Sequence, residues 1–130
     1  KYNINYDIIG MATPYSITYA GVKDFEAIFE KIIEKCGSTL DIFSGPVPCD
    51  TLNLTSNKIP SLTMSNGGFV WGHTPADDMK NIDKRGFDQP IDFSSELINY
   101  LDSLEKIPQG YTDDIEKQLD IYATRYGWDF

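Results

Sequence analysis

Histidine, cysteine and long apolar runs are all scarce in this chain of 130 residues. It has one histidine, His73, and two cysteines, Cys36 and Cys49, whose spacing matches neither a zinc site nor a redox pair. The apolar runs are only a few residues long, so we expect no membrane-spanning helix. The sequence has no phosphate-binding loop, G-x-S-x-G motif or H-E-x-x-H motif. We therefore expect a protein without a cofactor and without a metal.

The two cysteines also bear on the cellular compartment. A chain of this length can build a hydrophobic core without a disulfide. We therefore expect free thiols in the cytosol, although the sequence leaves a single Cys36–Cys49 disulfide open. The first residues do not form the basic and then apolar pattern of a leader peptide.

Positive charge is also in short supply. The chain has 11 Lys and Arg against 20 Asp and Glu, which gives a net charge of −9. This charge opposes binding to nucleic acids and to anionic membranes. Most of the imbalance lies in residues 66–130, which carry a net −7, while residues 1–65 carry a net −2. The second half is therefore either a solvated surface or a surface that attracts a basic partner.

Alternation of apolar and polar residues predicts a β-sheet in the first half of the chain. Tyr2 to Ile9 and Tyr15 to Ala20 alternate on either side of a turn, which predicts an antiparallel hairpin. This tyrosine-rich hairpin is either a half-buried sheet face or a contact surface. Four further strands are predicted at Thr39–Phe43, Thr51–Thr55, Ile59–Met64 and Phe69–Trp71.

Helical periodicity is clearest between residues 23 and 36, where apolar residues recur at intervals of three and four before Gly37. A short helix from Pro75 to about Ile82, a helix capped by Asp92 and a last helix capped by Thr112 are also predicted. The expected fold class is α+β, with a mostly antiparallel sheet of about five to six strands, one early helix and two to three C-terminal helices. We expect residues 1–130 to form a single domain.

His73 is the first candidate for chemistry, because histidine is the side chain that most readily gains or loses a proton near neutral pH. It lies where a predicted strand meets a predicted helix, and Asp77 or Asp78 could orient it. Cys49 could serve as a nucleophile if the fold brought it near. A small hydrolase or transferase that uses His73 is therefore the alternative function, and a homo-oligomeric structural subunit is another.

The main functional hypothesis follows from the acidic second half of the chain. This small, acidic, motif-poor profile resembles that of bacterial immunity proteins, which neutralise toxic nucleases by masking a basic cleft. The resemblance implies a cytoplasmic, non-enzymatic inhibitor that binds a basic protein partner such as a toxin. No residue is assigned by the resemblance, and the expected contacts rest on local charge density. They are Asp77, Asp78, Asp83, Asp88, Asp113, Asp114, Glu116 and Asp120.

Overall fold

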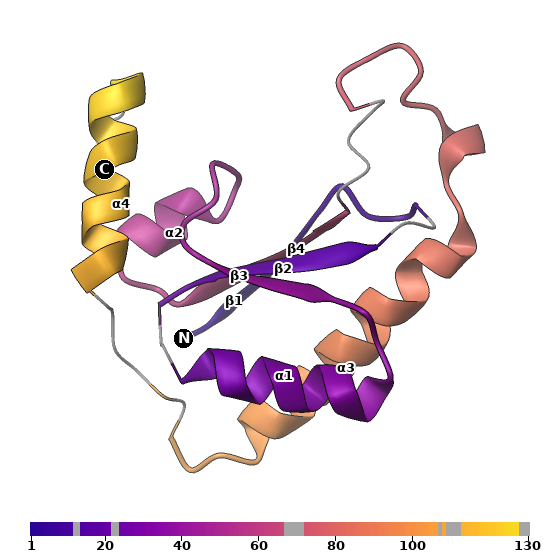
Figure 1. Cartoon of the computed structure of the whole chain (residues 1–130), viewed down its shortest axis with the longest axis horizontal. Coiled ribbons are helices and arrows are strands. Elements are labelled where there is room, and N and C mark those ends of the chain that lie inside the picture. The colour runs from indigo at the N-terminus through magenta and orange to yellow at the C-terminus, as the bar shows by residue number, and fades with distance from the viewer. Residues whose placement is uncertain (12–13, 22–23, 67–71, 107, 109–112, 128–130) are drawn as a thin grey trace.

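The computed structural model describes the chain apart from residues 12–13, 22–23, 67–71, 107, 109–112 and 128–130. Within the described part there are four β-strands and four α-helices (Figure 1). The strands are β1 (Asn3–Asp7), β2 (Tyr15–Ala20), β3 (Asp41–Ser44) and β4 (Ser61–Asn66). The helices are α1 (Phe25–Cys36), α2 (Leu52–Ser56), α3 (Asp88–Asp102) and α4 (Asp113–Tyr126). Two short 3₁₀ segments, η1 (Met79–Asn81) and η2 (Lys84–Phe87), precede α3.

The four strands form a mixed sheet in the order β1-β4-β2-β3. Strand β4 is antiparallel to β2 and parallel to β1, and β2 is parallel to β3. The predicted fold class is therefore wrong about the sheet. The prediction was a mostly antiparallel sheet of five to six strands, whereas the structure has a mixed sheet of four described strands. The predicted hairpin is also wrong, because β4 lies between β1 and β2 and pairs Ile4 with Leu62 and Ile17 with Met64.

Helix α1 confirms the prediction from helical periodicity. Phe25, Phe29 and Ile32 are buried, so the apolar face of the helix packs on the sheet. The helix ends at Gly37, which has φ 62° and donates its backbone N–H to the carbonyl of Glu34 at 3.1 Å. This left-handed cap satisfies carbonyls that the last turn of a helix leaves without partners.

Other predicted elements differ from the structure. The predicted strand at Thr51–Thr55 is helix α2, in which the buried residues Leu52 and Thr55 are three positions apart, as on one face of a helix. The predicted helix from Pro75 to Ile82 is reduced to η1. Helix α3 begins at Asp88, so Asp92 lies inside the helix and does not cap it. The predicted strand Phe69–Trp71 and the predicted cap Thr112 lie outside the described residues.

The main core lies between the sheet and helices α1 and α3, which cover the same face (Figure 1). Its centre is aromatic, with the ring centroids of Phe29 and Phe93 5.8 Å apart in an edge-on arrangement. A smaller cluster lies on the side of the sheet that carries α2 and α4 (Figure 1). It consists of Ala20, Leu52, Ile115 and Leu119.

Among the described residues, no helix has the length and apolar character needed to cross a lipid bilayer.

Candidate functional site

The single histidine lines a concavity at the carboxyl end of β1. The concavity has a volume of about 520 Å³, and the residues that line it include Asp7, Ile8, His73, Asp77 and Asp78. Two segments that are far apart in the sequence therefore meet here: the end of β1 with the turn after it, and the segment that leads from His73 to η1. The concavity brings His73 together with Asp77 and Asp78, either of which was predicted to orient it.

Hydrogen bonds hold in place the turn after β1, whose residues Ile8 and Met11 line this concavity. The N–H of Asp83 donates to the carbonyl of Gly10 at 2.7 Å, and the N–H of Asn66 donates to the carbonyl of Ile8 at 3.0 Å. The side chain of Asn66 also donates to the carbonyl of Met11 at 3.1 Å. The turn after β1 is thus tied both to β4 and to the segment before α3.

Two residues of the concavity have a positive φ, which is uncommon for residues other than glycine. Ile8 has φ 57° and His73 has φ 60°, both in the left-handed region. A β-branched residue is seldom found there, because its side chain crowds the backbone. Among the described residues, Lys58 is the only other non-glycine residue with positive φ. Backbone strain of this kind collects at functional sites, where the surrounding structure enforces it.

The acidic side chains near His73 differ in their partners. Asp78 forms an ion pair with Lys80 at 3.4 Å. Asp83 forms a short ion pair with Arg85, and the hydrogen bonds that Arg85 donates to its carboxylate lower the pKa of Asp83 to about 2. Asp7 and Asp77 make no ion pair with a described residue. The concavity therefore has a negative potential that favours a cationic group.

The eight carboxylates predicted to bind a partner do not form one surface. Asp77 and Asp78 line the His73 concavity, Asp83 is paired with Arg85, and Asp88 is the first residue of α3. The other four residues are on α4, which lies on the far side of the molecule from η1 and η2 (Figure 1). They are Asp113, Asp114, Glu116 and Asp120. Glu116 is also partly neutralised, since it pairs with Lys58 at 2.8 Å.

The two cysteines are free thiols. Cys36 lies on α1, where burial and the nearby carboxylates of Glu96 and Asp92 raise its pKa. The Sγ atom of Cys49 lies 3.1 Å from the hydroxyl of Thr51 and 3.4 Å from that of Thr63. These neighbours are hydroxyl groups and supply no base that would activate the thiol as a nucleophile.

His73 and the carboxylates around it are all common metal ligands. Across the described part of the chain, however, no group of three or more His, Cys, Asp or Glu side chains could hold a metal ion. The described residues therefore do not fit a metal centre by themselves.

Sequence reasoning missed the contribution of β1 to the site. Asp7 is the last residue of β1, and Ile8 and Met11 follow it in the turn. The available signal was the carboxylate of Asp7 at the carboxyl end of β1. In parallel sheets, ligand sites lie beyond the carboxyl ends of the strands. The parallel pairing of β1 with β4 was not predicted, so that signal was not recognised.

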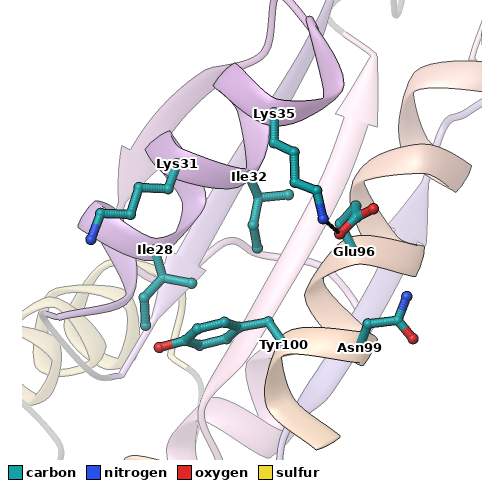
Figure 2. A pocket seen from close by; sticks show the side chains of 7 residues that line it. All are labelled: Ile28, Lys31, Ile32, Lys35, Glu96, Asn99 and Tyr100. Atoms are coloured by element: carbon teal, nitrogen blue, oxygen red, sulfur yellow. Dashed lines mark hydrogen bonds and ion pairs between the residues drawn. The ribbon is translucent and has the colours of Figure 1, made fainter. Parts of the chain in front are cut away.

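A second concavity, of about 380 Å³, lies between α1 and α3 (Figure 2). Ile28, Ile32 and the ring of Tyr100 form its apolar part, and Lys35 pairs with Glu96 across it at 2.5 Å. Its lining includes neither histidine nor cysteine. It lacks the group that most easily moves a proton near neutral pH, so the His73 concavity is the better candidate for catalysis.

Comparison with known proteins relates the chain to a protein family. No curated protein and no solved structure matches the chain. The sequence model of Peptidase family M28 matches residues 1–98, which contain β1, His73 and every residue of the concavity around it. The predicted immunity-type inhibitor is therefore wrong, and so is its role in toxin neutralisation. The match covers most of the 130 residues, and the chain belongs to Peptidase family M28.

Proposed function

We propose that this chain takes part in the hydrolysis of peptide bonds, and that the reacting amide binds in the concavity around His73. One observation carries the proposal: the only histidine of the chain shares a concavity with Asp7, Asp77 and Asp78, inside the region that matches a peptidase family. Of the functions considered from the sequence, the hydrolase that uses His73 agrees with this site.

Cleavage of an amide by water requires a proton to leave the water and a proton to reach the departing amine. The imidazole of His73 is suited to both transfers, because it can hold the proton between the two steps. The carboxylates that share the concavity would stabilise the imidazolium while it carries the proton. Their negative potential also favours peptides with a positive charge near the cleaved bond. A basic partner of this protein is therefore proposed to be a peptide substrate.

The cytosol remains the proposed compartment. The support for it is that both cysteines are free thiols, as is usual in a reducing environment.

Replacement of the histidine tests the proposed role. His73→Ala should lower kcat/KM for basic peptides by about a hundredfold or more, because a general acid–base group contributes at least that much. The melting temperature should stay unchanged, since the side chain is exposed. Hydrolysis is followed by mass spectrometry of peptide mixtures, and thermal unfolding by circular dichroism.

Lys58→Ala is the matched control, because Lys58 has nearly the same φ, 59°, and does not line the concavity. It should hydrolyse peptides at the rate of the unsubstituted chain. The proposal is wrong if the unsubstituted chain cleaves no peptide, or if His73→Ala cleaves peptides as fast as Lys58→Ala.

A further inference from the structure

The facing sides of α1 and α3 form the walls of the concavity of about 380 Å³ that Figure 2 shows. On each helix the lining residues are three or four positions apart, and side chains at this spacing lie on one face. They are Ile28, Lys31, Ile32 and Lys35 on α1, and Glu96, Asn99 and Tyr100 on α3. The concavity is therefore built entirely by these two helices.

Part of this lining is apolar. Ile32 is 6% exposed and belongs to the main core, and Ile28 packs against that core. The ring of Tyr100 reaches from α3 towards Ile28, so an aromatic side chain borders the same space (Figure 2). A volume of about 380 Å³ lies within the range of sites that bind small molecules. The concavity therefore suits a small ligand with a branched or aromatic apolar body.

The polar part of the lining has an excess of positive charge, although the whole chain has a net charge of −9. Lys35 pairs with Glu96, whereas Lys31 forms no ion pair with a described residue. Lys31 and Lys35 are four positions apart on one helix, where like charges repel each other. An anionic group beside Lys31 would relieve this repulsion, and the flexible stem of the lysine lets its ammonium turn towards that group.

The lining suits a carboxylate better than a phosphate. It contains no arginine, and so it lacks the planar fork of donors that matches phosphate oxygens. Its excess of one positive charge equals the single negative charge of a carboxylate, whereas a phosphate monoester carries about two at neutral pH. The amide of Asn99 and the hydroxyl of Tyr100 are further donors in the same lining.

We propose that the concavity between α1 and α3 is a binding site for a small apolar carboxylate. The apolar body lies against Ile28, Ile32 and Tyr100, and the carboxylate binds the ammonium of Lys31. This site shares no lining residue with the His73 concavity, so the proposal is independent of the proposed hydrolysis. The negative potential of the His73 concavity disfavours a carboxylate, which distinguishes the two sites chemically.

Titration with phenylacetate gives the direct test, and phenylacetamide is the probe of the same shape without the charge. Both are added to the full chain at low salt, and binding is followed by NMR of the isoleucine methyl groups. Phenylacetate should shift the signals of Ile28 and Ile32 saturably, and phenylacetamide should bind about fivefold more weakly or less. The signal of Ile121, on α4, should not move. Equal affinities of the two probes, or no saturable shift at Ile28 and Ile32, would overturn the proposal.

The charge contact is tested by Lys31→Gln, with Lys84→Gln as the matched control. Both lysines are exposed, and Lys84 does not line the concavity, so the two variants have the same net charge and differ only in where it was changed. Lys31→Gln should weaken the binding of phenylacetate by about threefold or more, and Lys84→Gln should leave it unchanged. Equal affinities of the two variants for phenylacetate would show that Lys31 does not hold the carboxylate.

The apolar contact is tested by Tyr100→Ala, with Ile91→Ala as the control on the same helix. Ile91 is 57% exposed and does not line the concavity. Tyr100→Ala should weaken the binding of phenylacetate by about fivefold, because it removes the aromatic wall. Ile91→Ala should bind phenylacetate like the unsubstituted chain. If the two variants bind it equally well, the apolar body does not lie against Tyr100 and the proposal is wrong.

Two further probes identify the ligand class more closely. Tighter binding of phenyl phosphate than of phenylacetate would overturn the choice of a carboxylate. N-acetylphenylalanine imitates the carboxyl end of a peptide: if it binds more tightly than phenylacetate, the carboxylate is that of a peptide, and if more weakly, that of a free acid. Shifts of Ile28 and Ile32 that grow with protein concentration in the absence of a probe would show that a second copy of the chain occupies the concavity, which would also overturn the proposal.

Discussion

At the scale of single residues, the carboxylate of Asp83 supports the local structure through its charge. Its Oδ1 atom accepts a hydrogen bond from the backbone N–H of Arg85 at 2.9 Å and another from Nε at 3.0 Å. These bonds hold the start of η2, and the N–H of Asp83 holds the turn at Gly10. The ionised form of Asp83 therefore stabilises the conformation next to the His73 concavity.

This dependence predicts a pH effect on stability. The pKa of Asp83 is lowered to about 2 in the folded chain, mainly by its hydrogen bonds with Arg85. The unfolded chain, with an ordinary pKa of about 3.9, therefore binds more protons in the interval between the two values. The stabilisation by Asp83 is present above about pH 4 and is lost as the pH falls towards 2.

Accordingly, Asp83→Asn should be less stable than the unsubstituted chain at pH 7, and the difference should disappear near pH 2. Urea unfolding at a series of pH values measures it. Asp120→Asn, at an exposed carboxylate on α4, is the control and should show no such pH-dependent difference. A difference between Asp83→Asn and the unsubstituted chain that is constant across pH would contradict the prediction.

Ile8 allows a second prediction at this scale. Its φ of 57° crowds a β-branched side chain, whereas asparagine tolerates the left-handed region. Ile8→Asn should therefore raise the free energy of unfolding by about 0.5–1 kcal/mol. The same change at Lys58, which is not β-branched, should raise it less. A lower free energy of unfolding in Ile8→Asn would contradict this prediction. It would show that the apolar contacts of Ile8 stabilise the fold by more than its backbone strain destabilises it.

The sequence identified some of these residues. His73 was a candidate because it is the only histidine, and Asp77 or Asp78 because they follow one turn later. Asp7 and Ile8 were not candidates, because their importance arises from a contact with a segment more than sixty positions away. Local patterns carry little information about such a contact.

At the scale of elements, the hydroxyl of Tyr15 joins three parts of the chain. It accepts a hydrogen bond from the N–H of Gly10 at 3.0 Å and donates a short one to the carbonyl of Gly86. Strand β2 is thereby connected to the turn after β1 and to η2. Gly86 packs so closely there that a Cβ would lie 2.5 Å from backbone atoms of Met11.

Removal of this hydroxyl should destabilise the fold. Tyr15→Phe leaves a buried N–H and a buried carbonyl without their partner, which costs about 1–3 kcal/mol. Tyr100→Phe, at a more exposed tyrosine on α3, should change the free energy of unfolding by less than about 0.5 kcal/mol. Both are measured by urea unfolding, and equal losses in the two variants would contradict the prediction.

Long elements were predicted better than short ones. The apolar stripe of α1 runs through three turns, and no strand produces that spacing. Helix α2 has only five residues, and its Leu52 and Leu54 also fit the period of a strand. In a window this short the two periods cannot be separated, so the burial of Thr55 beside Leu52 could be known only from the structure.

At the scale of the whole molecule, α4 is attached more weakly than the other long helices. Helices α1 and α3 share the main core with the sheet, whereas α4 is anchored through a cluster of four buried residues. Resistance to local opening depends on buried apolar contacts. The match to the peptidase family also ends at residue 98, before α4 begins.

We therefore predict that amide protons of α4 exchange through local opening, with a lower free energy than those of α1 and α3. Native-state hydrogen exchange at increasing urea concentration measures this: the α4 amides should depend little on urea, and the α1 amides strongly. Coincident exchange of the three helices would show that α4 unfolds only with the whole domain.

The order of the strands was beyond the reach of the sequence. Turn signals between neighbouring segments favoured pairing of consecutive strands, as in a meander. In the structure, β4 lies between β1 and β2. Its residues Leu62 and Met64 are fully buried in the main core, and the central position of the strand makes this burial possible. Which strand takes the central position is decided by packing across the entire domain.

That central position has a consequence for synthesis on the ribosome. Asn3 leaves the ribosome well before its partner Ser61, and β2 also needs β4 beside it. Until Asn66 has left the exit tunnel, both early strands lack their main neighbour and keep apolar side chains in water. Pairing over such separations slows folding and leaves the nascent chain open to aggregation. The sheet can therefore assemble only after β4 has been synthesised, whatever the speed at which β1 and β2 emerge.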